Sequence, residues 1–556
     1  MNLGLRTEFL GAWTDGDCHI GNIESDLTKS GTYPFIYPSC VNKLGVSGLT
    51  GNASGSTFKN SVSTGWGPRI GFAWDMMGRH TTTVRGGYGI YYVREDVGAV
   101  DQLSFQSPFI PIVFFGQTPG FTMSDFFTGT PATNPNAVPA AGTLSGAWLP
   151  CLAQLTSFPD TNGAATYGGC TGPGVNSTQN LFVLEVPRHF VVPNTQQWNL
   201  TVQRELGGHW VLEAGYVGTR GIHLRETRDA IQSVNASPTN PFTVTDASNN
   251  TYTITTNTFA NAIARTPTPG LNGYSGYQIF ANDAYSIYHA LQATVSRRWG
   301  ANYFQAAYTF SKNIDATSTG NTAFNTAYND QSNINASRGI SDFNRPHRLA
   351  VSYAYDIPLF AHATGAKKAA FGGWQVSGVT IFQNGLPFSI FDSGAGTAFL
   401  GQGSTPLLGA SLAPGASIAS GLSSGDIHSR VANGYLNPAA FTPVPYYYYP
   451  TTAPGQCAIP TGPDPSGNTC VTGFGDLGRN IYHGPFQQNW DVSFLKHFKI
   501  GERQDVRFAA DFFNLWNHTN FGDPAVTDIE AGSSFGKILQ TNGNPRLIQF
   551  SLRWAF

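Results

Sequence analysis

Six cysteines are the residues whose chemistry is easiest to read from this sequence. They fall as three local pairs with no C-x-x-C motif, and His19 beside Cys18 is a lone neighbour, so the spacing does not indicate a metal site. A disulfide in each pair would close a loop of about 14–23 residues, which is worth roughly 3 kcal/mol by chain entropy. We therefore predict no metal and three local disulfides in an oxidising compartment, between Cys18 and Cys40, Cys151 and Cys170, and Cys457 and Cys470.

Catalytic motifs are missing from the sequence. It contains no G-x-S-x-G, no H-E-x-x-H and no Walker lysine motif. The run Gly86-Gly87-Tyr88-Gly89 resembles a fragment of a phosphate loop, but it lies inside an alternating segment and no helix follows it. We interpret these glycines as small lumen-facing residues, and we predict no catalytic residue, no cofactor and no enzyme activity.

Two other segments concentrate polar or aromatic side chains. The stretch Asp342–Arg348 places several charges where a loop enters a strand, and a polar network fixing the loop to the sheet is favoured over contact with a ligand or plug. The run Tyr446, Tyr447, Tyr448 and Tyr449 lies in a long loop and could stack sugars or aromatic ligands. Simple packing within the loop explains the four tyrosines equally well.

The composition is weakly charged and aromatic. Charged residues make up 12% of 556 residues, against roughly 25% in average soluble domains, and aromatic residues make up 13%. The net charge is −2 and the basic residues are scattered singly, which argues against nucleic-acid binding. No apolar run reaches about 18 residues, so no transmembrane helix is predicted.

Period-two alternation predicts the elements that must carry these residues. In the last segment Ile548, Phe550, Leu552 and Trp554 fall on one face, while the alternate positions are mostly polar or small. Few segments show helical periodicity. We predict an all-β, antiparallel fold with about twelve strands, near 2–12, 66–76, 81–94, 194–206, 208–218, 285–299, 301–312, 346–357, 372–391, 487–499, 503–516 and 545–556.

The connections alternate between short turns and long loops, so long loops gather at one end of the sheet. Outer-membrane barrels sort their connections in this way, with long extracellular loops and short periplasmic turns, and a soluble β-sandwich has no reason to. The same alternation favours one strand over 372–391, although Asn384-Gly385 could make a hairpin turn there. We predict a transmembrane β-barrel portion with an apolar face toward outer-membrane lipid and a polar face toward a wet lumen.

The C-terminal part of the sequence carries many motifs in a specific order. They are Gly475–Asn480, Gly484-Pro485, Asn489–Ser493, Glu502-Arg503, Phe508, Asp511–His518, Asn520–Gly522, Pro545-Arg546 and Gln549-Phe550, with Pro68–Trp74 and Arg85–Tyr92 upstream. With these motifs the sequence resembles a known family, the Oar-like TonB-dependent receptors. The resemblance implies an outer-membrane barrel of a Gram-negative-type bacterium that takes up an extracellular ligand, energised through TonB. It also implies that Phe556, with Phe550, Leu552 and Trp554, forms the C-terminal signal read by the barrel-assembly machinery.

Members of that family also carry an N-terminal regulatory-like domain, a plug with a TonB box and a 22-stranded barrel. Nothing in this sequence matches the plug or the box, and its first residues alternate like a strand instead of following the plan of a signal peptide. We therefore expect residues 1–556 to be the C-terminal part of a receptor barrel, lacking its plug and its first strands. The leading hypothesis is TonB-coupled uptake of an unidentified ligand such as an oligosaccharide or peptide; a surface-display or adhesion barrel and a passive porin are the alternatives.

Overall fold

The structure is a computed structural model of the whole chain. It describes several long stretches together with isolated short segments between them. The long stretches are 1–11, 62–78, 81–93, 181–187, 191–230, 232–237, 239–245, 251–255, 274–318, 328–360, 365–393, 408–443, 473–500 and 504–555.

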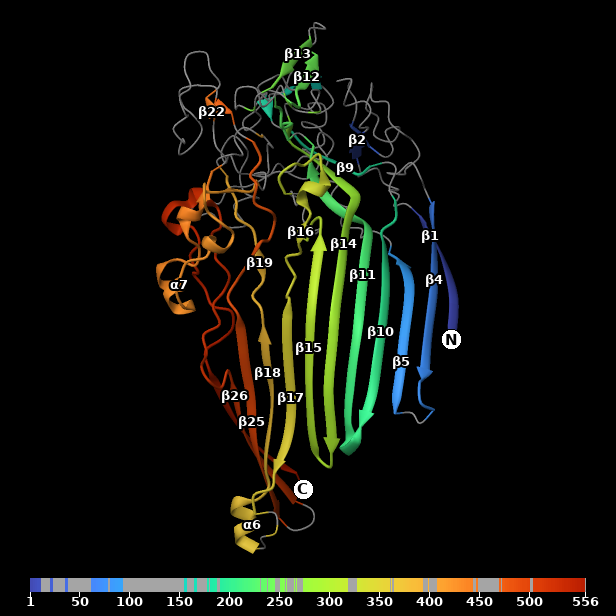
Figure 1. The fold of residues 1–556 in the computed structure, drawn as a ribbon, viewed down its shortest axis with the longest axis vertical. Helices are drawn as coiled ribbons and strands as arrows, with labels where there is room; N and C mark the ends of the chain where they lie inside the picture. Colours follow the sequence, from blue (N-terminus) through green and yellow to red (C-terminus); the bar gives the residue numbers. More distant parts are fainter. Residues whose placement is uncertain are drawn as a thin grey trace, which may run out of the picture.

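One large antiparallel sheet dominates the molecule (Figure 1). Its twelve main strands follow one another in chain order, each paired with the one before and the one after. They are β1 (Asn2–Gly11), β4 (Val62–Asp75), β5 (Thr82–Tyr92), β10 (Asn194–Leu206), β11 (Trp210–Asp229), β14 (Tyr274–Trp299), β15 (Asn302–Asp315), β17 (His347–Ile357), β18 (Trp374–Gln383), β25 (Gln487–Ile500), β26 (Gln504–Phe513) and β27 (Leu547–Ala555). Two short strands join this sheet, β9 (Leu181–Glu185) beside β14 and β16 (Gly339–Ile340) beside β15.

All twelve predicted segments correspond to these strands, but the lengths differ. β11 and β14 extend well past the predicted ranges 208–218 and 285–299. Their upper parts pair through two register shifts between Gly221 and Glu226. These shifts interrupt the period-two alternation, so the sequence pattern did not show the extra length.

Of the segment 372–391, predicted as one long strand, only Trp374–Gln383 form a strand of the main sheet. Residues Pro387–Phe388 form β19, which pairs with β24 (Tyr482–His483) outside that sheet, so the predicted C-terminal extension was wrong. Asn384 leaves the sheet with its backbone N–H bonded to the carbonyl of His347 (3.1 Å).

The two ends of the sheet carry different connections (Figure 1). At one end the links are short: Gly78 and Gly300 make turns with positive φ, and a 3₁₀ turn at Gly207–His209 joins β10 to β11. The helix α6 (Gly365–Phe371) lies at the same end, between β17 and β18. The opposite end carries the long connections, so the sorting predicted from the sequence is confirmed.

The two faces of the sheet differ in chemistry. We call apolar face the one that carries Phe550, Leu552 and Trp554 of β27, whose side chains are 66%, 72% and 61% exposed, and polar face the opposite one. The cross-strand register continues the apolar face through the sheet, to Leu200 and Val202 on β10 and to their partners on β11. Exposed apolar surface of this extent in an antiparallel sheet requires an apolar solvent, which a lipid bilayer provides.

Aromatic side chains form a belt near each end of the apolar face. Near the loop end, Trp490 packs against Phe382 (5.6 Å between ring centroids) and Trp516 (6.3 Å). Near the turn end, the guanidinium of Arg297 lies over Trp210 (5.2 Å) and Trp299 (4.6 Å). On β14 the ring of His289 stacks on Tyr216 (6.0 Å between centroids) toward the loop end, ten residues from Trp299. At ~3.3 Å per residue and a ~40° tilt this separation gives a height of roughly 25 Å, matching the apolar band of outer-membrane barrels.

Glycines on the apolar face lie directly beneath aromatic rings of the neighbouring strand. Trp198 is the register partner of Gly218, and Phe72 is the partner of Gly86. A Cβ on Gly218 would lie 2.2 Å from the Trp198 ring, and one on Gly86 would lie 2.5 Å from the Phe72 ring. The rings therefore occupy the space of the missing side chains. We predicted all of these glycines to face the lumen; this was wrong for Gly86, which lies on the apolar face, whereas Gly87 and Gly89 lie on the polar face.

A layer of folded loops lies above the C-terminal half of the sheet (Figure 1). It contains α7 (Ile427–Asn433) and the strand pairs β19 (Pro387–Phe388) with β24 (Tyr482–His483) and β20 (Ser411–Leu412) with β21 (Phe441–Thr442). Its own hydrophobic core includes Ile390, Leu436, Tyr482 and Phe535. We call this the loop layer; it comprises the described parts of 384–486 and 514–546.

Smaller strand pairs complete the secondary structure. They are β2 (Gly21–Ile23) with β3 (Ile36–Pro38), β6 (Leu155–Ser157) and β8 (Thr178–Gln179) with β7 (Ala165–Tyr167), β12 (Phe242–Thr245) with β13 (Thr251–Ile254), and β22 (Tyr447–Tyr448) with β23 (Cys470–Val471). None of the helices in the described part of the chain is long and apolar enough to cross a membrane.

The sheet has two open edges, β1 and β27. In the described residues β1 pairs with β4 alone and β27 with β26 alone, so closure into a barrel is not detected. Backbone groups facing lipid without a partner cost several kcal/mol each. In the membrane these two edges must therefore be paired, either with each other or with further strands.

Candidate functional site

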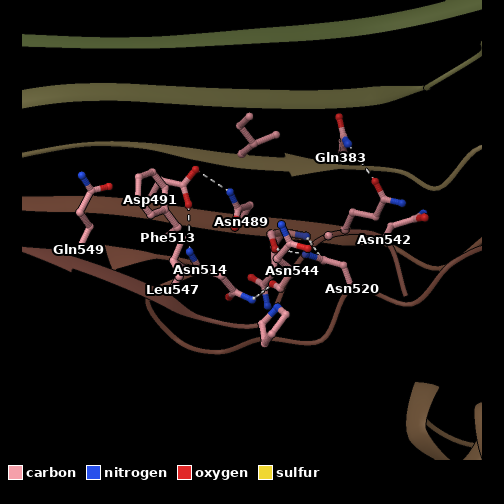
Figure 2. A pocket seen from close by; sticks show the side chains of 15 residues that line it. Gln383, Asn489, Asp491, Phe513, Asn514, Asn520, Asn542, Asn544, Leu547 and Gln549 are labelled. Carbon is pink, nitrogen blue, oxygen red and sulfur yellow. Dashed lines mark hydrogen bonds between the residues drawn. The ribbon is translucent and has the colours of Figure 1, made fainter. Parts of the chain in front are cut away.

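A polar pocket of about 580 Å³ opens on the polar face near the loop end of the C-terminal strands (Figure 2). Side chains from β18, β25, β26 and β27 form its wall, and the connection 514–546 folds back to cover it. Most of its lining groups are primary amides, and Asp491 is the single ionisable side chain among the lining residues. The amides are Gln383, Gln487, Gln488, Asn489, Asn514, Asn520, Asn542, Asn544 and Gln549.

Asp491 is held in place by two hydrogen bonds from within the pocket. Its Oδ1 accepts from the backbone N–H of Asn514 (2.9 Å), and its Oδ2 accepts from the Asn489 amide (2.9 Å), as Figure 2 shows. Alternation along β25 places Asn489 and Asp491 on the same face, two residues apart. The carboxylate thus orients Asn489 so that the carbonyl oxygen of this side chain remains available as an acceptor.

Two asparagines tie the covering connection to the sheet. Asn514 adopts a left-handed backbone conformation (φ 53°), and its side chain bonds both the N–H and the carbonyl of His518 (2.9 Å each). The same amide donates to the carbonyl of Asn544 (3.2 Å). Asn520 exchanges two bonds of 2.9 Å with the backbone of Gln488. These contacts hold the connection 514–546 in place over the pocket, although it contributes no strand to the main sheet.

A glutamine pair forms the upper rim of the pocket. Gln383 donates to the side-chain carbonyl of Gln487 (2.9 Å), and Arg345 approaches the same oxygen (3.4 Å). Burial lowers the pKa of the Arg345 guanidinium, partly offset by the nearby carboxyl of Asp523. Arg345 also donates to the carbonyl of Asn384, so this residue fixes the point where β18 leaves the sheet.

The remaining lining groups are available to a ligand. Asn542, Asn544 and Gln549 are exposed, and Phe513 and Leu547 add apolar surface beside them. Primary amides both donate and accept, and they carry no charge. This combination suits a neutral ligand with many hydroxyl or peptide groups, held by several hydrogen bonds and one or two apolar contacts.

Arg479 and Asn480 anchor the loop layer to the sheet. Arg479 is buried and forms an ion pair with Asp315 at the end of β15, and it donates to the carbonyl of Ser337 (2.9 Å). Asn480 donates to the carbonyl of Ile340 (2.7 Å) and bonds Asp342. The charged stretch that begins at Asp342 is therefore a polar network fixing loop to sheet, the interpretation favoured from the sequence.

The other sequence predictions fall outside this pocket. The backbones of Tyr447 and Tyr448 form β22 and pair with Val471 and Cys470 of β23, while Tyr446 and Tyr449 lie outside the described residues. The side chain of Cys470 and the other five cysteines, Cys18, Cys40, Cys151, Cys170 and Cys457, also lie outside, so the disulfides stay a prediction. Phe550, Leu552 and Trp554 share the exposed apolar face of β27, and Phe556 is outside the described residues.

Sequence reasoning missed the amide pocket although it quoted several of its residues. Asn489, Asp491, Asn514 and Asn520 belong to the motifs that carry the family resemblance, where we attached no binding role to them. The density of amides in Gln487-Gln488-Asn489 was the available signal. Its partner segment, Asn542-Gly543-Asn544, lies about 55 residues away, and period-two alternation says nothing about how a loop folds back.

An antiparallel sheet with an apolar exposed face, two aromatic belts and sorted loops defines an outer-membrane β-barrel protein of the Gram-negative type. A family model described as "Outer membrane beta barrel domain" matches residues 1–549. The chain belongs to this family. Among curated proteins, no match was found.

The chain is similar, at low identity, to solved structures of outer-membrane transporters and receptors. The transporter YddB from Escherichia coli is 9% identical, with a TM-score of 0.38 over 89% of this chain and 41% of its own. The ferripyoverdine receptor of Pseudomonas aeruginosa is 10% identical (TM-score 0.32; 89% and 34%), and the siderophore receptor PirA from Acinetobacter baumannii is 8% identical (0.32; 89% and 41%). This chain therefore spans about two-fifths or less of the length of these proteins.

Proposed function

We propose that this chain is the C-terminal barrel portion of an Oar-like TonB-dependent receptor that takes up a neutral, hydroxyl-rich ligand, most simply an oligosaccharide. The observation that carries the proposal is the amide-lined pocket on the polar face, with Asn489 oriented by Asp491. A peptide, which also presents donors and acceptors along its length, is the second ligand class that such a lining accommodates. Nothing in this arrangement suggests a reaction, and we propose no enzyme activity.

The lining of the pocket favours a neutral ligand over an anionic one. The lining residues include one carboxylate and no cation, and the cation at the rim, Arg345, is engaged with Gln487 and the carbonyl of Asn384. An anionic ligand would therefore meet repulsion from Asp491 with no free cation among the lining residues to compensate it. Hydroxyl groups can both donate to and accept from the amides of Asn542, Asn544 and Gln549. Phe513 offers an apolar surface against which the face of a sugar ring can pack.

Calorimetric titration of the protein in detergent micelles tests the proposal. Neutral oligosaccharides such as maltoheptaose and cellohexaose, and a neutral hexapeptide, are the probes. We expect at least one of them to bind, and Asn489→Leu with Asn544→Leu to weaken that binding by about 10-fold for each lost pair of hydrogen bonds. Gln292→Leu, an exposed amide on the polar face of β14, is the matched control and should leave the affinity unchanged.

Two results would contradict the binding role. The first is equal affinity of the double variant and the native protein, which would place the ligand elsewhere. The second is no binding of any neutral probe, which would favour a surface-display or adhesion barrel. A steady open conductance in planar bilayers would instead support a passive porin.

Energised uptake also requires a partner in the inner membrane. In the proposed receptor, TonB acts through a plug, and no segment of this sequence matches one. Uptake driven by TonB is therefore proposed for the receptor as a whole. It can be tested in cells by comparing ligand uptake with and without TonB, with the full receptor gene expressed in both.

A further inference from the structure

A second hollow opens on the same polar face, over the N-terminal strands of the sheet. Its volume is about 460 Å³, and it lies over β1, β4, β5, β10 and β11, separated from the amide pocket by β14, β15 and β17. Its chemistry differs from that of the first pocket, because it contains a cation and no carboxylate among its lining residues.

Glycines form the floor of this hollow. Gly71 and Gly87 are register partners on β4 and β5, and Arg69 is the partner of Gly89. A Cβ on Gly71 would have nothing closer than 3.8 Å, so its absence leaves open space above the strand. The side-chain oxygen of Asn199 lies 3.3 Å from the place of a Cβ on Gly87, and the Tyr91 ring covers Gly89, so the bare part of the floor is at Gly71. A bare floor of this kind lets a flat ligand approach the backbone closely.

Arg69 projects a half-buried guanidinium beside that floor. Its guanidinium carbon lies 4.6 Å from the centroid of the Tyr91 ring, so one face of the group is stacked and its orientation is fixed. Its Nε is buried without a hydrogen-bond partner, and no carboxylate pairs with Arg69 among the described residues. A guanidinium held in this way presents a planar fork of donors that fits a carboxylate.

Neutral hydrogen-bonding groups surround the cation. Gln197 and Asn199 of β10 are exposed in the hollow, and Thr219 of β11 lies beside them. Arg85, exposed on the same polar face of β5, has no ion pair among the described residues and adds positive potential. The hollow therefore combines one oriented cation, several amide or hydroxyl groups and a flat floor.

We propose that this hollow is a second ligand subsite, which binds the carboxylate of an acidic sugar residue such as a uronate. The guanidinium of Arg69 binds the carboxylate, Gln197 and Asn199 bind ring hydroxyls, and the sugar ring lies over Gly71. This inference rests on the proposed function. It narrows the ligand to an oligosaccharide with neutral and acidic residues, one class for each hollow.

The test compares tetragalacturonate with its methyl ester by calorimetry on the 556-residue protein in detergent. We expect the acid to bind more tightly than the ester, and Arg69→Gln to weaken binding of the acid by about 10- to 100-fold while leaving the ester unchanged. Arg69→Lys should recover only part of the affinity, because lysine keeps the charge but lacks the planar fork. Raising the salt concentration should weaken binding of the acid and leave binding of the ester unchanged.

Arg298→Gln is the matched control. Arg298 also stacks on a tyrosine on the polar face (Tyr303, 5.0 Å), but its strand has no glycine floor and it lies near the turn end. Its loss should leave both affinities unchanged. Unchanged far-UV circular dichroism and heat-shifted gel mobility confirm that each variant is folded.

The outcomes separate the two proposals. Equal binding of acid and ester, or an unaltered affinity in Arg69→Gln, overturns the carboxylate subsite whether or not neutral oligosaccharides bind. Loss of neutral binding in Asn489→Leu with no preference for the acid supports the amide pocket alone. Arg69-dependent binding of the acid without any binding of neutral probes supports this subsite and contradicts the first.

Discussion

Arg479 and Asp315, 164 positions apart in the chain, form a buried ion pair where the loop layer meets the upper end of β15. Each side chain is only 7% exposed, and Asp315 also accepts a bond from Ser318 (2.8 Å). Arg479 further donates to the carbonyl of Ser337. One side chain therefore connects the loop between β18 and β25 to two earlier segments.

Replacing Arg479 by methionine should loosen the loop layer and leave the sheet intact. The substitution strands a buried carboxylate, which typically costs about 3–5 kcal/mol. Amides of the loop layer should then exchange with deuterium about 100-fold faster or more. Lys537→Met, which removes an exposed cation from the same layer, is the control. Native exchange rates in Arg479→Met would show that the ion pair is not the anchor.

Acid should weaken the loop layer through His483. Burial lowers the pKa of this imidazole below its usual 6.5, and its Nε2 is buried without a hydrogen-bond partner. The unfolded layer then binds more protons than the folded one. The stability contributed by neutral His483 is therefore complete above about pH 6.5 and is lost as the pH falls from there through the lowered pKa of the folded layer.

Protease resistance of the loop layer between pH 5 and 7.5 measures this effect. His483→Gln should be less sensitive to acid than the native protein across that range. Burial raises the pKa of Asp523, which works in the opposite direction, but that contribution is common to both proteins and cancels in the comparison. Identical pH profiles would exclude His483 as the source.

The cysteines provide a prediction about the long loops. Non-reducing mass mapping should recover three local disulfides, between Cys18 and Cys40, Cys151 and Cys170, and Cys457 and Cys470. Reduction should lower the stability of each closed loop by roughly 3 kcal/mol in the chain-entropy model. A free thiol, or a bridge between two different loops, would refute the pairing.

The apolar face of β27 should be needed for assembly into the outer membrane. We propose that Phe550, Leu552, Trp554 and Phe556 are read by the barrel-assembly machinery. Replacing Leu552 and Trp554 by serine should lower the amount of heat-shifted, folded protein in the outer-membrane fraction several-fold. Ser551→Ala on the polar face should have no effect. Normal assembly of the serine variant would place the signal elsewhere.

The twelve strands could be predicted from the sequence because a sheet with lipid on one face repeats its chemistry every second residue. The alternation in β27 is nearly perfect, and the faces follow from it directly. The upper parts of β11 and β14 could not be predicted, because register shifts between Gly221 and Glu226 interrupt the repeat.

The candidate site was less accessible to sequence reasoning. The amides of β25 and those near Asn542 meet only because Asn514 turns the chain back with a positive φ and bonds the carbonyl of Asn544. The glycine floor at Gly87 was noticed as a motif, but its meaning depends on Arg69, which lies on the neighbouring strand. Contacts of this kind depend on cross-strand register, which alternation along one strand does not specify.

The rings that cover glycines on the apolar face have a consequence for how this sequence can evolve. An alanine at Gly218 would collide with Trp198, and a small residue in place of Trp198 would uncover a bare stretch of backbone. Each single change is harmful, whereas exchanging the two residue types between the strands restores the fit. Substitutions at the two partner positions should therefore be coupled in evolution. In related barrels the aromatic residue and the glycine should exchange strands together.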